Sequence, residues 1–183
     1  MIKKVINNPK DVVVETADGL ILAYHGEVEK IENANAIKRT KIHPGKVCLL
    51  VGGGSGHEPL FAGFVGENLA DGAVSGNVFA APAPDQILAA TKALDQGKGV
   101  LYLYGNYAGD NMNFDIAAEL AESEGVATKT VRIYDDVASA PLERITDRRG
   151  IAGDLFVIKI AGGAAAKLDS LEEVYRVTAK ARD

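Results

Sequence analysis

The stretch Val47–Pro59 reads V-C-L-L-V-G-G-G-S-G-H-E-P and joins an apolar run to a glycine-rich turn. The run Val47–Val51 predicts a short buried strand. The three glycines that follow let the backbone turn sharply and approach a ligand closely. A strand that ends in glycines and leads into a helix is a common way to build a binding crevice at the edge of an α/β sheet. We therefore expect a binding site at this turn.

Polar side chains follow the glycines, where apolar side chains at helical spacing predict a helix over residues 57–69. Ser55 and Glu58 fit a capping box at its start, and Ser55 is expected to cap because no base is obviously placed to activate it as a nucleophile. His57 has two interpretations. It either makes a local hydrogen bond or exchanges a proton with a ligand near neutral pH, and its glycine-rich flanks favour the second role.

The pattern of strand, glycine loop and helix recurs along the chain. Further strands are expected over residues 73–79, 100–104 and 128–134, and further helices over 11–22, 84–94, 113–123, 151–168 and 171–181. This alternation predicts one α/β domain over residues 1–183, with a largely parallel sheet flanked by helices on both faces. The glycine loops after residues 51 and 104 would then share the carboxyl edge of the sheet, where His57 and Asp110 could meet.

Composition excludes several classes of protein. The net charge of −5, with no clustered Lys/Arg stripe, argues against a nucleic-acid partner. No apolar run is long enough to cross a bilayer, and Met1–Lys4 is not followed by the apolar segment of a signal peptide. Cys48 is the single cysteine, which excludes a disulfide framework or a cysteine metal site within the chain and makes a reducing cytoplasm the expected location.

One acidic residue and two charged pairs each have two interpretations. Asp110 is either the N-cap of the helix expected over 113–123 or a carboxylate that faces His57. The pair Asp135-Asp136 could bind a metal but is more commonly a solvated turn, and the pair Arg148-Arg149 could hold a phosphate but more commonly pairs with local acids. The dinucleotide, P-loop and G-x-S-x-G motifs are absent.

Five short motifs together resemble the substrate-binding subunit of the dihydroxyacetone kinase family. They occur in the family's order over nearly the whole chain: G-G-G-S-G-H-E-P at 52–59, P-A-P-D-Q at 82–86, N-Y-A-G-D-N-M-N-F at 106–114, D-D-V-A at 135–138 and R-R-G at 148–150. The resemblance implies a component of a phosphotransfer system that acts on short ketoses such as dihydroxyacetone.

The resemblance also assigns roles to residues. The first loop would bind the ketose through the positions Gly54, Ser55, Gly56 and His57. His57 would act as hydrogen-bond partner and base, and Asp110 would contact the hydroxyl group to be phosphorylated. The chain itself would hold no metal or cofactor. A separate helical subunit or domain would hold ATP and magnesium, or a phosphotransferase partner would deliver phosphate derived from phosphoenolpyruvate, and the subunits would pair as homodimers.

Two departures from the family pattern affect these expectations. Gly105 stands where family members commonly carry a lysine, which removes a cationic contact and admits a related ketose such as a four-carbon one. The family subunit also has a further half, whose histidine captures the substrate carbonyl covalently, and no such residue precedes Asp183. We therefore expect an N-terminal half or a member without the covalent anchor. The alternatives are a non-catalytic sensor or regulator that binds a small ketose, and a domain whose loops are structural.

Overall fold

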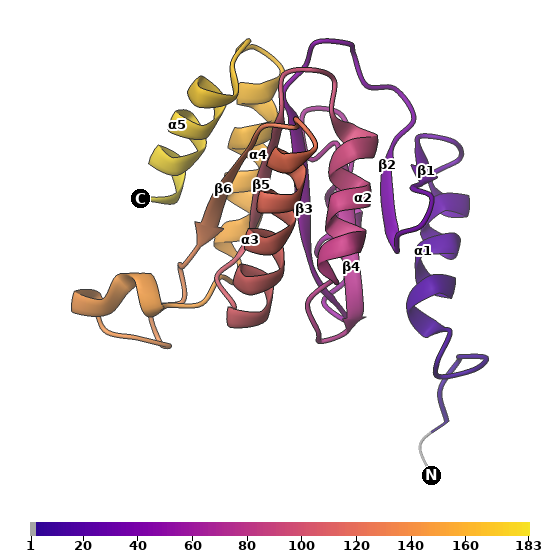
Figure 1. The fold of residues 1–183 in the computed structure, drawn as a ribbon. Helices are drawn as coiled ribbons and strands as arrows, with labels where there is room; N and C mark the ends of the chain where they lie inside the picture. Colours follow the sequence, from indigo (N-terminus) through magenta and orange to yellow (C-terminus); the bar gives the residue numbers. More distant parts are fainter. Residues whose placement is uncertain (1–2) are drawn as a thin grey trace.

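A six-stranded sheet in the order β1-β2-β4-β3-β5-β6 forms the centre of the computed structural model, which describes residues 3–183 (Figure 1). The expectation for Met1–Lys4 therefore lies partly outside the described residues. The strands are β1 Val28–Lys30, β2 Ala36–Arg39, β3 Cys48–Ser55, β4 Gly72–Val78, β5 Val100–Gly105 and β6 Thr128–Ile133. The helices are α1 Val12–Ala23, α2 Pro84–Leu94, α3 Ala108–Ser123, α4 Gly153–Ala165 and α5 Leu171–Arg182, with short 3₁₀ helices η1 Ala62–Phe64 and η2 Leu142–Asp147.

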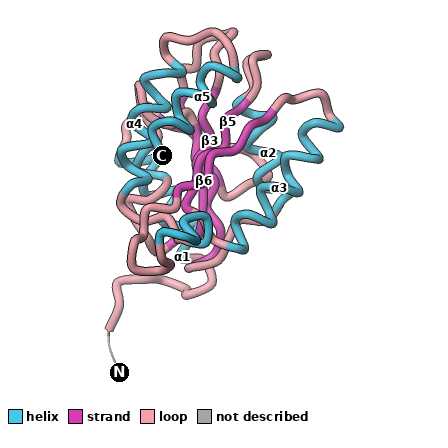
Figure 2. The backbone as a smooth tube through the Cα atoms, turned by 90° about the vertical axis from the view of Figure 1, so that its left-hand side faces the viewer, coloured by secondary structure: helices cyan, strands magenta, loops and turns pink. Residues whose placement is uncertain are grey.

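The sheet is largely parallel and carries helices on both faces, which confirms the predicted fold class. Strands β4, β3, β5 and β6 pair in parallel, whereas β1 and β2 add an antiparallel edge. Figure 2 views the sheet edge-on, with α4 and α5 covering one face and α2 and α3 the other. Helix α1 packs on the α4 side through Leu20, Ile21 and Tyr24. None of the helices in the described part of the chain is long and apolar enough to cross a membrane.

The central strands are buried on both faces, which explains their continuous apolar sequences. Every residue of β5 is buried, as are all but one of β3. Leu49 and Val51 contribute to the core under α4, while Leu50 contributes to the core under α2 and α3. Central parallel strands are typically apolar on both faces for this reason. The short edge strands β1 and β2 carry no such run, so the sequence pattern did not reveal them.

The chain leaves β3 and β5 in opposite directions, which opens a crevice between their carboxyl ends. After β3 the chain forms η1 on the face of the sheet that α4 covers, where Phe61 and Val65 pack in the core. It then returns as β4. After β5 it passes α3 on the other face and returns as β6. Ligands of open α/β sheets bind at such a reversal of strand order.

Two of the predicted helices differ from the structure. The helix expected over 57–69 is wrong: only η1 forms there, because Pro59 and the glycines at 63 and 66 disfavour helix while Phe61 and Val65 pack individually against the sheet. The helix expected over 113–123 begins earlier, at Ala108. Its N-cap is Tyr107, so Asp110 lies inside the first turn and is not the cap.

Candidate functional site

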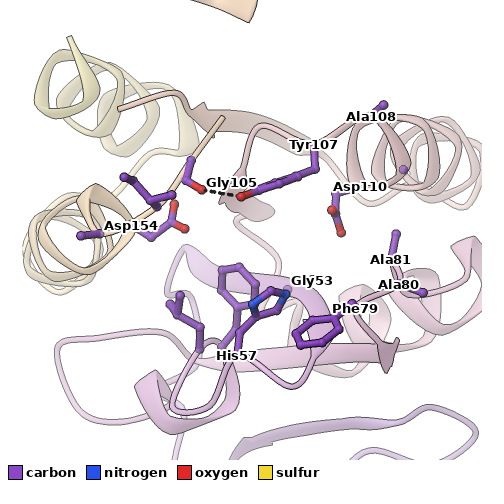
Figure 3. A pocket seen from close by; sticks show the side chains of 18 residues that line it. Gly53, His57, Phe79, Ala80, Ala81, Gly105, Tyr107, Ala108, Asp110 and Asp154 are labelled. Carbon is purple, nitrogen blue, oxygen red and sulfur yellow. Dashed lines mark hydrogen bonds between the residues drawn. The ribbon is translucent and has the colours of Figure 1, made fainter. Parts of the chain in front are cut away.

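A cavity of about 730 Å³ lies at the carboxyl ends of β3 and β5, where the strand order predicts one (Figure 3). Four segments that are distant in the sequence form its walls. Its lining residues are Gly52, Gly53, Gly54, His57, Leu60, Phe61, Phe79, Ala80, Ala81, Gly105, Tyr107, Ala108, Gly109, Asp110, Gly150, Ile151, Ala152 and Asp154. The cavity thus brings together both glycine loops, as well as the residues His57 and Asp110 that the sequence analysis singled out.

The first wall comes from β3 and the loop after it, where close packing requires glycine. A Cβ atom on Gly53 would lie 2.3 Å from the ring of Phe61, and one on Gly54 would lie 2.7 Å from the backbone nitrogen of Ala80. His57 lies beyond these glycines with an exposed side chain, and its ring meets the ring of Phe79 edge-on at 5.0 Å. The imidazole therefore stands at the accessible rim of the cavity.

Ser55 and Gly56 are not among the residues that line the cavity. The Ser55 hydroxyl is buried and donates a hydrogen bond of 2.7 Å to the carbonyl oxygen of Gly76, which ties β3 to β4. The expected capping box is wrong, because Ser55 belongs to β3 and no helix begins next to it. Glu58 instead accepts a hydrogen bond of 3.1 Å from the backbone N–H of Gly56, which stabilises the turn.

Asp110 enters the cavity from the first turn of α3. Its side chain is buried, and its Oδ1 atom has no hydrogen-bond partner among the described residues. Burial raises the pKa of Asp110 from 3.8 to about 6, so its carboxyl group can exchange a proton close to neutral pH. An unpartnered, buried carboxyl group in a cavity is suited to bind and orient a ligand hydroxyl.

Asn106 and Tyr107 hold in place the segment around Gly150, which forms another wall of the cavity. The Asn106 side-chain amide donates hydrogen bonds to the carbonyl oxygens of Thr146, at 2.9 Å, and of Arg148, at 2.7 Å. The Tyr107 hydroxyl donates to the carbonyl oxygen of Gly150 at 3.1 Å. These bonds explain why the N-Y-A-G-D motif and the distant R-R-G motif occur together: the first positions the second.

The arginine pair forms no ion pair with an acid within residues 3–183, so that expectation is wrong, whereas the aspartate pair is engaged locally. Arg148 donates from Nε to the carbonyl oxygen of Ala140, and the guanidinium of Arg149 lies 5.8 Å from the centre of the Tyr107 ring. Asp135 is more than a solvated turn residue, because its carboxylate accepts hydrogen bonds from the backbone N–H groups of Ile151, at 2.8 Å, and Gly153, at 2.7 Å. It thereby fixes the start of α4. No cluster of His, Cys, Asp or Glu within residues 3–183 could hold a metal ion.

Asp154 is the cavity residue that the sequence analysis missed. It lies in the first turn of α4, is 2% exposed, and has an Oδ1 atom without a hydrogen-bond partner among the described residues. Burial raises the pKa of Asp154 to about 7, with smaller contributions from Asp135 and Asp110. The signal that could have revealed it is an acidic residue at the start of a strongly apolar helix, directly after the R-R-G motif.

Comparison with known proteins identifies the family of this chain. Residues 18–183 match the model of the Dak1 domain. The chain belongs to the Dak1 domain family. This finding agrees with the resemblance that the five motifs carry.

Curated relatives of this Dak1 domain are kinase components for short ketoses. The dihydroxyacetone-binding subunit DhaK of PTS-dependent dihydroxyacetone kinase 2 from Listeria innocua is 46% identical, over 98% of this chain and 54% of its own length. The L-erythrulose 1-kinase of Mycolicibacterium smegmatis is 39% identical, over 97% of this chain and 31% of its own. The chain spans about half the length of the DhaK subunits that it matches and about a third of the L-erythrulose 1-kinase.

Solved structures share the fold. The dihydroxyacetone kinase of C. freundii superposes with a TM-score of 0.92 and 34% identity, over 100% of this chain and 34% of that chain. A dihydroxyacetone kinase operon co-activator, Dha-DhaQ, superposes with a TM-score of 0.83 and 27% identity, over 91% of this chain and 51% of that chain. The fold of this Dak1 domain therefore occurs both in a kinase and in a co-activator.

The cavity of this Dak1 domain combines one imidazole with two buried acids. Figure 3 shows the carboxyl groups of Asp110 and Asp154 approaching from α3 and α4, with the ring of His57 across from them on the loop after β3. None of the lining residues is a lysine or arginine. Such a lining can accept protons and bind hydroxyl groups, but it offers no fixed cation to an anionic ligand.

Proposed function

We propose that this Dak1 domain binds a short ketose and presents one of its primary hydroxyl groups for phosphoryl transfer from a partner. The observation that supports this most directly is that His57 and Asp110 line one cavity at the crevice between β3 and β5. Relatives that are 39–46% identical over nearly the whole chain are dihydroxyacetone-binding subunits and erythrulose kinases. The proposal assigns the binding of the ketose to this chain. The phosphoryl donor would be held by the partner.

His57 and Asp110 would share the work at the hydroxyl group. Asp110 orients the hydroxyl from a fixed position in the first turn of α3, and His57 accepts its proton as the oxygen attacks the phosphorus atom. Phosphoryl transfer depends mainly on positioning, and base assistance typically contributes about 10²–10⁴-fold. Gly54 shapes the wall beside them, whereas Ser55 and Gly56 act by holding the loop, since neither lines the cavity.

The partners follow from this role. We propose a helical nucleotide-binding subunit that holds ATP and magnesium, or a phosphotransferase protein that carries phosphate derived from phosphoenolpyruvate. His57 and Phe79 are exposed at the rim of the cavity, where such a donor would approach. We also propose a homodimer in the cytoplasm, and the free, buried thiol of Cys48 suits a reducing compartment.

A sensor or regulator that binds a ketose without turnover is the second candidate, and the similarity to the Dha-DhaQ co-activator favours it. A coupled assay separates the two functions. The chain is incubated with dihydroxyacetone or L-erythrulose and with ATP or phosphoenolpyruvate, with and without candidate partner subunits. Phosphorylated ketose that forms only with a partner supports the kinase component. Calorimetric binding without product under either donor supports the sensor, and no binding at all contradicts both.

A further inference from the structure

Asp154 has a polar atom that nothing in the described part of the chain satisfies. Its side chain is 2% exposed and lines the cavity, and its Oδ1 atom accepts no hydrogen bond. Within residues 3–183 it also takes part in no ion pair. A buried polar group without a partner is costly, so proteins seldom keep one that has no role. In a binding cavity, the simplest role is to meet a hydrogen-bonding group of the ligand.

Gly105 lies close beside this carboxyl group. A Cβ atom on Gly105 would lie 3.3 Å from Oδ2 of Asp154 and 3.2 Å from the ring of Tyr107, both tight contacts. Any larger side chain at this position would therefore begin against the Asp154 carboxyl group. With glycine at position 105, no side chain covers this carboxyl group, and it remains available to a ligand in the cavity.

The charged groups of the cavity favour a neutral ligand. Asp110 and Asp154 are two buried acids in one cavity, and no lysine or arginine lines it. An anionic ligand would lack a compensating charge, whereas each hydroxyl group of a neutral sugar can hydrogen-bond to a carboxyl group. Asp110 is already assigned to the hydroxyl group that receives phosphate. Asp154 comes from another helix, α4, and lies on the opposite side of the cavity from Asp110 (Figure 3), where it can meet a different part of the ligand.

We propose that Asp154, left uncovered by Gly105, is a second hydroxyl-binding residue and that it makes this Dak1 domain prefer a four-carbon ketose over a three-carbon one. The proposal rests on the proposed ketose binding and specifies its substrate. The additional hydroxyl group of a tetrulose hydrogen-bonds to the unpartnered carboxyl group of Asp154. A triose fills the site around Asp110 and leaves Asp154 without a partner.

Isothermal titration calorimetry on the full chain with dihydroxyacetone and L-erythrulose tests this preference. We expect the wild type to bind L-erythrulose at least about tenfold more tightly, the size of one well-placed hydrogen bond to a charged or buried group. Asp154→Leu keeps a similar volume but removes the hydrogen-bonding group, and is expected to bind both ketoses with similar affinity. Asp85→Asn is the matched control, because Asp85 is an exposed acid in the first turn of α2, and it should retain the preference.

A second variant tests whether Gly105 keeps the Asp154 carboxyl group uncovered. Gly105→Lys is expected to weaken L-erythrulose binding more than dihydroxyacetone binding, and circular dichroism verifies that each variant is folded. A wild type that binds both ketoses equally, or an Asp154→Leu variant that keeps the preference, overturns this inference and leaves the proposed function standing. If the wild type binds neither ketose, the proposed function fails and this inference fails with it.

Discussion

The two glycine-bearing loops that meet at the cavity differ in structure and in what they contribute. The loop after β3 continues into turns and η1, and its functional side chain, His57, is exposed. The loop after β5 runs directly into α3 and buries Asp110 in the first turn. A buried side chain on a helix is fixed before the ligand arrives, whereas an exposed imidazole remains accessible to solvent and to a partner. This difference fits the proposed function, in which the second loop would position the substrate and the first would face the donor.

The largest expected effects are those of substituting His57 in the first loop and Asp110 after the second, measured on both activity and stability. In the reconstituted kinase, His57→Ala and Asp110→Asn should each abolish turnover or reduce it by about 10²–10⁴-fold. Their stabilities should differ: His57→Ala leaves the melting temperature unchanged because the side chain is exposed, whereas Asp110→Asn raises it because a buried carboxyl group loses its charge. Steady-state kinetics and calorimetric melting measure both effects. Unchanged turnover in either variant would remove that residue from the mechanism.

The buried acids also predict how stability depends on pH. The pKa of Asp154 is raised from 3.8 to about 7, so the folded chain holds a proton there that the unfolded chain releases. The resulting decrease in the free energy of unfolding is absent well below pH 3.8, grows as the pH rises, and is complete above about pH 7. It amounts to roughly 4–5 kcal/mol at about 1.4 kcal/mol per pH unit. The groups that raise this pKa besides burial are Asp135 and Asp110, while the hydroxyl of Tyr107 also lies at this wall.

Urea titrations of Asp154→Asn and wild type at pH 4 and pH 8 test this sign. The variant should be more stable than wild type at pH 8 and nearly equal to it at pH 4, where the wild-type carboxyl group is largely protonated. Asp85→Asn again serves as control, because the exposed Asp85 should leave the pH profile unchanged. A variant that is less stable than wild type at pH 8 would show that Asp154 has a compensating partner.

A smaller effect should show that the glycines at the end of β3, directly before the first loop, are required by packing. Gly54→Ala would place a Cβ atom 2.7 Å from the backbone nitrogen of Ala80 and 2.9 Å from the carbonyl carbon of Phe79. Backbone atoms cannot turn away as a flexible side chain can, so we expect a loss of about 1–3 kcal/mol in the free energy of unfolding. Chemical denaturation measures this loss. A neutral result would mean that the connection from β4 to α2 shifts easily.

The fold and part of the site could be predicted from the sequence, and the two loops show which features could not. The apolar run of β5 and the amphipathic helix at 84–94 are local signals, and these elements were predicted close to their observed bounds. Strand β3 was predicted to end at Val51 with a glycine turn after it, which is wrong, because the strand continues through the three glycines to Ser55. The helix at 57–69 was predicted from the same spacing, but Phe61 packs against Gly53 from a non-helical segment, which is a tertiary contact. Asp154 was missed because its burial depends on how α4 docks against the ends of β5 and β6.

The smallest expected effect concerns Gly109, the glycine of the second loop that lies within α3. A Cβ atom there would come only to 3.4 Å of the Ala81 side chain, an ordinary contact, and its backbone is helical. Gly109→Ala should therefore stabilise the chain by about 0.5–1 kcal/mol, because alanine loses less backbone entropy than glycine in a helix. Urea denaturation with an unchanged slope would measure the gain. Together with a destabilised Gly54→Ala, it would show that the glycine before the first loop is needed for close packing, whereas the glycine after the second loop is not. A loss of stability in Gly109→Ala would place both loops under the same packing constraint.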